Sequence, residues 1–189
     1  DTGAMYRTVG LLAVRTNTDR HDDAALAELL KNADIRVLRV DGSQHMALGG
    51  EDVEKLIRTP EISMAASDVA SCPSVRRALV ALQQKIAAGC DVVMDGRDIG
   101  TRVLPDADYK FFLTASDKVR AQRRYDELKA KGESVTLQEV LEDVRRRDEQ
   151  DTTRAESPLT IADDATEVET DDLGIDEVVT VLMALMGRF

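Results

Sequence analysis

The hydrophobic positions along the chain repeat with two different periods, one typical of helices and one typical of strands. Apolar residues recur every three or four positions in several long segments, most clearly at Val75, Leu79, Leu82 and Ile86. This spacing places the apolar side chains on one face of a helix. We therefore expect helices over residues 3–16, 23–32, 51–88, 117–131, 136–150 and 175–186.

Short β-prone runs lie between these helices. Because strands that alternate with helices favour a mostly parallel sheet covered on both faces, the predicted fold class is α/β. Residues 35–40 and 45–48 flank an Asp41-Gly42-Ser43 turn, which predicts a hairpin that forms a small insert outside that sheet. The strands of the main sheet are expected at residues 91–94, 110–113 and 166–169.

Composition and charge limit the class of protein. The chain has 189 residues, 43% hydrophobic and 32% charged, which favours one folded globular domain. No apolar run approaches the ~18 residues that span a bilayer. A formal net charge of −11 argues against a nucleic acid or a membrane as partner. Cys72 and Cys90 form no CxxC motif, so we expect free thiols, no zinc site and a cytoplasmic location.

Three charged clusters are candidates for a ligand site. The first, Asp95-Gly96-Arg97-Asp98, directly follows the predicted strand at 91–94. Ligands of open α/β sheets bind beyond the carboxyl ends of strands, so these charged groups would project into a binding crevice. A polar turn held by a local Arg–Asp pair is the alternative, and this segment leaves both interpretations open.

The second and third clusters lie at helix ends. In residues 147–154, charged side chains continue the apolar stripe of the preceding helix, which brings Arg147, Asp151 and Arg154 together on its inner face. The alternative is a surface ladder of ion pairs, worth only ~0.3–0.5 kcal/mol each. Residues 1–7 (DTGAMYR) open a helix whose free N–H groups, with an arginine on the second turn, offer an anion site.

The residue types favour phosphoryl transfer over other chemistries. The sequence shows no catalytic carboxylate pair, no Ser-His-Asp set and no metal-ligand cluster, and His21 and His45 receive no role. Many positioned arginines without an evident nucleophile fit a reaction that depends mainly on positioning and charge neutralisation.

Taken together, these segments resemble the bacterial cytidylate kinase family of nucleoside monophosphate kinases. The resemblance covers essentially the whole chain, and DGRDIGT followed by RDxxDxxR is its most specific part. The matching segments are DTGAMYR at 1–7, GEDVEKLIRTPEIS at 50–63, ASDVASCPSVRRAL at 66–79, DGRDIGTRVLPDADYKFFLTAS at 95–116 and RRRDEQDTTRAESPL at 145–159.

The resemblance implies a fold and an activity. The fold would be a P-loop NTPase-like parallel sheet flanked by helices, one domain over 1–189, with a monophosphate-binding insert at about 33–75 and a helical lid at about 117–150. The activity would be transfer of the ATP γ-phosphoryl group to CMP or dCMP. ATP and Mg²⁺ would be the cofactors of a cytoplasmic monomer whose partners are small nucleotides.

The resemblance also implies roles for individual residues. Different residues would bind the base, the ribose and the phosphate of CMP, and lid residues would bind ATP. Cytosine needs a carboxylate beside Arg and hydroxyl groups, because it offers an amino donor next to two acceptors. The base would be read by Ser67, Arg76 and Asp98, and the ribose would be bound by Arg147 and Asp151. The phosphate ligands and catalytic candidates would be Arg7, Arg97 and Arg154, with Thr2. The lid arginines that bind ATP would be Arg120, Arg123 and Arg124.

One part of the family pattern is absent from the printed residues. The family begins with a strand and a G-x-x-x-x-G-K-[ST] loop that holds the ATP phosphates, whereas none of the 11 glycines here is followed by Lys. We therefore expect an upstream segment ahead of Asp1, and without it exposed neighbouring strands and little kinase activity. A non-catalytic CMP-binding module and a kinase for UMP or AMP are the alternatives, although Asp98 and Arg76 disfavour the last.

Overall fold

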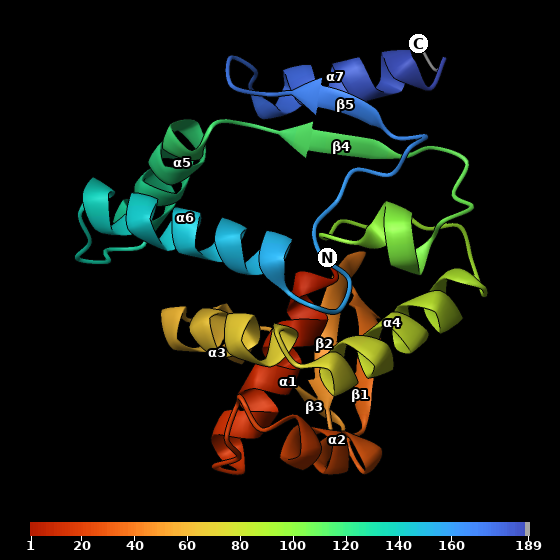
Figure 1. The fold of residues 1–189 in the computed structure, drawn as a ribbon, viewed down its shortest axis with the longest axis vertical. Helices are drawn as coiled ribbons and strands as arrows, with labels where there is room; N and C mark the ends of the chain where they lie inside the picture. Colours follow the sequence, from red (N-terminus) through yellow and green to blue (C-terminus); the bar gives the residue numbers. More distant parts are fainter. Residues whose placement is uncertain (188–189) are drawn as a thin grey trace.

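The computed structural model describes residues 1–187 and has an α/β architecture (Figure 1). Among these residues no helix combines the length and the apolar character needed to cross a bilayer. The elements in chain order are α1 (Gly3–Arg15), α2 (Asp23–Lys31), β1 (Ile35–Val40), β2 (Ser43–Leu48), β3 (Glu51–Asp52), a 3-10 turn (Leu56–Arg58), α3 (Pro60–Ala70), α4 (Pro73–Ala87), a π-helical turn (Ile99–Val103), β4 (Phe111–Thr114), α5 (Asp117–Ala130), α6 (Leu137–Thr153), β5 (Thr166–Glu169) and α7 (Ile175–Leu185).

Helix α1 runs through the centre of the main hydrophobic core. Val9 is fully buried, and so are Leu26 and Met46 from the elements packed around it. A Cβ atom on Gly10 would lie 3.0 Å from the backbone nitrogen of Ala66, so α1 and α3 cross at very short range. This close crossing fixes the N-terminal turn of α1 relative to α3.

The predicted hairpin is confirmed, and its second strand begins two residues earlier than expected. Strands β1 and β2 pair antiparallel with Val40 opposite Ser43, and the short β3 adds a third strand. Asp41 and Gly42 both have positive φ angles, 49° and 81°, as a two-residue turn between strands requires.

The predicted continuous helix over 51–88 is wrong in its first part and divided in its second. Residues 51–52 form β3, and helices α3 and α4 begin at Pro60 and Pro73. Proline lacks an N–H group and is favoured in the first turn of a helix, where that group would have no partner. Each proline therefore starts a new helix instead of continuing the previous one.

The parallel sheet is confirmed for two strands, and one predicted strand is wrong. Strands β4 and β5 pair in parallel with Phe111 opposite Thr166. Residues 91–94 form no strand, and Val93 is fully exposed. Within residues 1–187 no strand pairs with this segment, and a strand without a neighbour has no ladder of hydrogen bonds to stabilise it. In α7, which follows β5 in the chain, Ile175 and Val179 are also exposed.

Helices α5 and α6 form an antiparallel pair that reaches from the side of the molecule to its centre (Figure 1). The Thr136 hydroxyl and the Glu139 carboxylate exchange hydrogen bonds with the backbone at the start of α6, a capping box that fixes this end. The helix continues to Thr153, three residues beyond the prediction. Its last two turns, residues 147–153, therefore lie over α1 and α3.

Candidate nucleotide-binding site

The three charged clusters of the sequence meet in space. The Thr2 hydroxyl donates a hydrogen bond of 2.6 Å to the carbonyl oxygen of Asp95, which fastens the segment 95–98 to the start of α1. A Cβ atom on Gly96 would lie 2.5 Å from the Thr2 hydroxyl, so only glycine fits this contact. Arg97 Nε then donates to Asp151 of α6 over 3.0 Å. Local ion pairs are present too, since Arg147 lies 2.9 Å from Asp143 and Arg154 lies 2.7 Å from Asp151, so the ligand site stays a prediction.

A buried ion pair forms one side of this site. Arg76 Nη2 lies 2.6 Å from Asp98 Oδ2, and the two residues are only 2% and 4% exposed. Removing both charges from water costs several kcal/mol per ion, so such a pair is weak evidence for a role in stability alone. Arg76 also donates to the carbonyl oxygen of Ala70 at the end of α3, over 3.4 Å. Arg76 therefore holds Asp98 in place from a fixed position.

Tyr6 packs against this pair and was missed in the sequence analysis. The Arg76 guanidinium lies 5.3 Å from the centre of the Tyr6 ring, a cation–π contact. Burial raises the pKa of the Tyr6 hydroxyl to about 12, with nearby Asp98 and Asp151 adding to the rise and Arg76 and Arg154 opposing it. Thr2 and Tyr6 are four residues apart on α1 and hence on one helix face, which is the signal that could have located Tyr6.

Several buried polar atoms of the site have no hydrogen-bond partner among residues 1–187. They are Tyr6 Oη, Arg76 Nε, Arg147 Nε and Arg154 Nη2. The rest of the Arg154 fork is engaged, since Nη1 donates to Asp151 and Nε to the carbonyl oxygen of Ser157, each over 2.7 Å. An unpaired buried donor costs about 1–3 kcal/mol. Four of them together fit a ligand rich in hydrogen-bond acceptors, such as a nucleotide.

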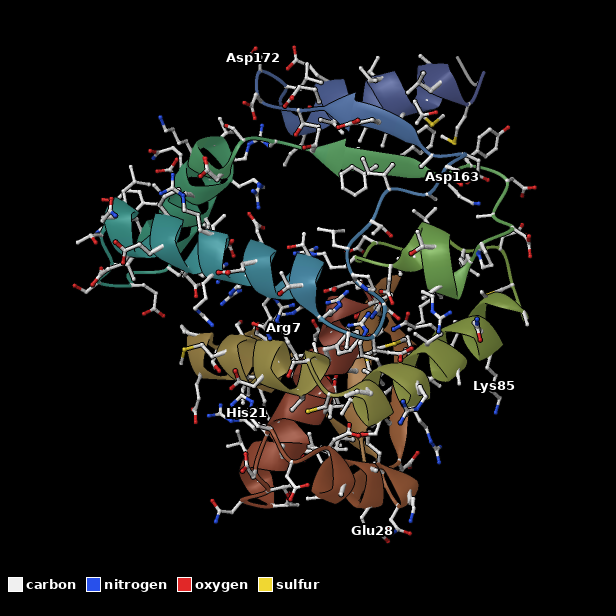
Figure 2. The ribbon with its side chains drawn as sticks, viewed as in Figure 1. Arg7, His21, Glu28, Lys85, Asp163 and Asp172 are labelled. Atoms are coloured by element: carbon white, nitrogen blue, oxygen red, sulfur yellow. The ribbon has the colours of Figure 1, made fainter. Side chains whose placement is uncertain are left out.

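A group of arginines surrounds Arg7 of α1. Burial lowers the pKa of Arg7, and the charges of Arg58, Arg124 and Arg147 lower it further. The carboxylate of Asp1 lies 4.0 Å away, at the limit of an ion pair. Figure 2 shows Arg7 in the region between α6, above it in this view, and α3, below it. Like charges repel, so this cluster favours a bound anion. Arg58 is a second residue that the sequence analysis missed.

The predicted lid arginines contact different residues. Arg120 grips Asp148 with both Nη atoms, over 2.8 and 2.7 Å. Arg123 donates to the carbonyl oxygens of Thr170 and Leu173, which ties α5 to the loop after β5. Arg124 alone is among the charges that act on Arg7. The three arginines lie on one face of α5 but have different partners in this structure, and their role as lid residues stays a prediction.

The remaining predicted residues have defined partners. Arg147 Nε lies 2.9 Å from Asp143, one turn earlier on α6. Ser67 on α3 is bound to Gln150 on α6, a third residue that the sequence analysis missed. Within residues 1–187, no group of three His, Cys, Asp or Glu side chains could hold a metal ion. We therefore assign no protein ligand to Mg²⁺ here.

An α/β chain with an antiparallel insert, a paired-helix arm and an arginine-lined centre belongs to the class of nucleoside monophosphate kinases. The family model "Cytidylate kinase" matches residues 1–188. The chain is 47% identical over 188 residues to a cytidylate kinase of Caldicellulosiruptor bescii, covering 100% of this chain and 83% of that protein.

A second cytidylate kinase, from Carboxydothermus hydrogenoformans, is 48% identical over 188 residues, covering 100% of this chain and 85% of the relative. A third, from Caldanaerobacter subterraneus, is 51% identical over 179 residues, covering 95% of this chain and 78% of the relative. The chain belongs to the cytidylate kinase family.

Proposed function

We propose that this protein transfers the γ-phosphoryl group of ATP to CMP or dCMP, giving ADP and CDP or dCDP. The observation that carries the proposal is the buried Arg76–Asp98 pair, 2.6 Å apart, next to a cluster of arginines. The ion pair suits recognition of a polar base, and the arginine cluster suits binding of phosphate. Membership of the cytidylate kinase family supports the same reaction.

The base would be read by Asp98 and Arg76. The Asp98 carboxylate accepts a hydrogen bond from the 4-amino group of cytosine, and the unpartnered Arg76 Nε donates to the ring nitrogen or the carbonyl oxygen. Uracil has a carbonyl oxygen in place of the amino group, which would face the carboxylate unfavourably. This difference disfavours UMP as the substrate.

The phosphate would be held by the arginines around the end of α6. Arg97 and Arg154 both bind Asp151 there, Arg7 lies near Arg147 of the same helix, and guanidinium groups donate hydrogen bonds without accepting any. They would neutralise charge on the CMP phosphate and on the transferring group, since phosphoryl transfer spreads negative charge over the equatorial oxygens. Thr2 contributes by fastening residues 95–98 to α1.

The ribose would be bound by Asp151 with Arg147. Asp151 accepts from both Arg97 and Arg154, so its carboxylate is held rigidly at the centre of the site. A carboxylate with a remaining lone pair accepts hydrogen bonds from ribose hydroxyls.

We also assign a lid, a domain division, an oligomeric state and a cellular location to the proposed enzyme. Residues 117–150 would act as the lid and 33–75 as the monophosphate-binding insert. Arg124, close to Arg7, is the lid arginine best placed to reach nucleotide phosphates. Mg²⁺ would arrive with ATP. We also propose a monomer in the cytoplasm, where the free thiols of Cys72 and Cys90 would stay reduced.

An assay of ADP release tests the proposed reaction. Purified full-length protein is mixed with ATP, Mg²⁺ and one of CMP, dCMP, UMP or AMP. We expect ADP release with CMP and dCMP and at least about tenfold less with UMP and AMP, in line with base-edge discrimination of ~1–3 kcal/mol. CMP binding without ADP release would favour a non-catalytic CMP-binding module, and equal rates with UMP would refute the assignment of the base readers.

A further inference from the structure

A pair of hydrogen bonds joins two helices at the edge of the proposed base site. Ser67 on α3 donates its hydroxyl proton to Gln150 Oε1 over 2.9 Å. Gln150 Nε2 on α6 donates to the backbone carbonyl oxygen of Ser67 over 2.7 Å. The two residues are 83 positions apart in the sequence. The side-chain amide of Gln150 therefore engages both the hydroxyl and the backbone carbonyl oxygen of Ser67.

The backbone carbonyl fixes the direction of both hydrogen bonds. A carbonyl oxygen only accepts, so it must face the NH₂ end of the Gln150 amide. The amide oxygen then faces the Ser67 hydroxyl and takes its single proton. A hydroxyl has one proton and two lone pairs, so Ser67 Oγ retains acceptor capacity but has no proton left to donate.

Ser67 lies beside the residues that would read the base. Ala70 is three residues further along α3, hence on the same face, and its carbonyl oxygen accepts from Arg76. Arg76 in turn holds Asp98 over 2.6 Å. Gln150 directly precedes Asp151, which binds Arg97 and Arg154. The Ser67–Gln150 pair therefore connects the base-reading residues with the ribose and phosphate residues.

We propose that Gln150 is a specificity-determining residue that acts through Ser67. By taking the hydroxyl proton it makes Ser67 Oγ an acceptor, which suits the 4-amino group of cytosine and not the 4-carbonyl oxygen of uracil. Gln150 is thus a positioning residue that touches Ser67 and need not touch the substrate. This inference rests on the proposed function, because it concerns how the same site tells CMP from UMP.

Calorimetric titration of CMP and UMP into the wild type and five variants tests the inference. Gln150→Met keeps the side-chain length and frees the Ser67 hydroxyl to rotate and donate. We expect it to bind UMP about fivefold more tightly than the wild type does, the worth of one hydrogen bond, with CMP affinity nearly unchanged. Ser67→Ala should weaken CMP binding about fivefold, and adding Gln150→Met to it should change neither affinity.

Gln138→Met is the matched control on the same helix. Gln138 is exposed and bonds only to Glu142, over 2.6 Å, so this variant should leave both affinities unchanged. A purely structural role for Gln150 predicts that Gln150→Met weakens CMP and UMP alike, and this result would overturn the inference. An unaltered UMP affinity in Gln150→Met would overturn it too.

Gln150→Glu covers the case in which the methionine variant fails to fold. The carboxylate loses the hydrogen bond to the Ser67 carbonyl oxygen but still takes the Ser67 hydroxyl proton, so both affinities should fall while the preference for CMP over UMP persists; loss of that preference would count against the inference. Titration of the wild type distinguishes failure of the proposed function from failure of the role of Gln150. If wild-type protein binds CMP and UMP equally, the proposed function fails, whereas a preference for CMP that Gln150→Met leaves intact defeats only the role of Gln150.

Discussion

At the scale of single residues, the centre of the molecule combines features that folding alone does not favour. Among residues 1–187 it holds a buried ion pair, four buried donors without hydrogen-bond partners and an arginine with three arginine neighbours. Each costs free energy in the folded state, and in the proposed function each would be relieved by a bound nucleotide. The site is therefore organised for its substrate at the expense of stability, as binding sites commonly are.

Replacing Asp98 by alanine should affect stability and selectivity together. The change leaves Arg76 buried without its counter-ion, which should lower the free energy of unfolding by about 3–5 kcal/mol. It should also reduce the discrimination between CMP and UMP by about 1–3 kcal/mol. Denaturant unfolding and calorimetry measure the two effects, with the exposed Asp106→Ala as control. An unchanged CMP preference in folded Asp98→Ala protein would remove the base-reading role.

Replacing Arg154 by alanine should lower turnover more than CMP affinity. The Arg154 side chain is 5% exposed and holds Asp151, yet its Nη2 has no partner. If that atom contacts the transferring group, kcat falls by about 100-fold, the typical loss for one donor to a transition state. The dissociation constant of CMP should change much less. A large loss of CMP affinity at constant kcat would contradict this role.

The raised pKa of Tyr6 makes stability depend on pH in the alkaline range. The hydroxyl titrates at about 12 in the folded protein and near 10 when unfolded. Its contribution is complete below pH ~10 and is lost as the pH rises from ~10 to ~12, because the unfolded chain then gives up the proton more easily. We expect this loss in wild-type protein and in the control Tyr109→Phe, where Tyr109 is half exposed, but not in Tyr6→Phe. Urea unfolding at several pH values measures it.

At the scale of elements, the site depends on how tightly three segments meet. The turn at 95–98 contacts the start of α1 through Thr2 and reaches α6 through Arg97. On α6, the helix face that is apolar in the first turns carries charged residues at its end. Small changes in backbone spacing at this junction should therefore change nucleotide affinity.

Substituting Gly96 by alanine tests this junction. The added Cβ atom would lie 2.5 Å from the Thr2 hydroxyl and 2.8 Å from Ile99, so the segments must separate. We expect a loss of about 1–3 kcal/mol in stability and a weaker binding of CMP. Gly89→Ala is the control, since its nearest atom would be at an ordinary 3.6 Å. Unchanged stability and affinity in Gly96→Ala would show that the junction is loose.

The sequence predicted most elements because their signals are local. The hairpin turn at Asp41-Gly42, the strand at 166–169 and the capped start of α6 each depend on a few neighbouring residues. Residues 91–94 were predicted as a buried strand from their apolar character, but a strand also needs neighbours, and the pattern within four residues does not reveal them.

The site was predicted in its charged residues and incompletely in its partners. The motifs located Arg76 and Asp98, which form an ion pair, and Asp151, which accepts from Arg97. They could not reveal that Arg123 is occupied by backbone carbonyls or that Gln150 binds Ser67, because those contacts join segments 47 and 83 residues apart. Such pairings depend on the tertiary fold and leave no short-range pattern.

At the scale of the whole molecule, an acidic chain carries one concentrated positive region. The formal net charge is −11, whereas Arg7 lies among Arg58, Arg124 and Arg147. A negative surface repels extended polyanions, and a local arginine cluster still attracts a small anion at short range. This distribution of charge agrees with a mononucleotide as substrate rather than a nucleic acid.

The most direct test is calorimetric titration of the protein with CMP, UMP and cytidine. We predict that CMP binds most tightly and that UMP and cytidine each bind at least about tenfold more weakly, because UMP lacks the amino group and cytidine lacks the phosphate. An absence of heat with CMP on folded protein, or equal affinities for all three, would contradict the account.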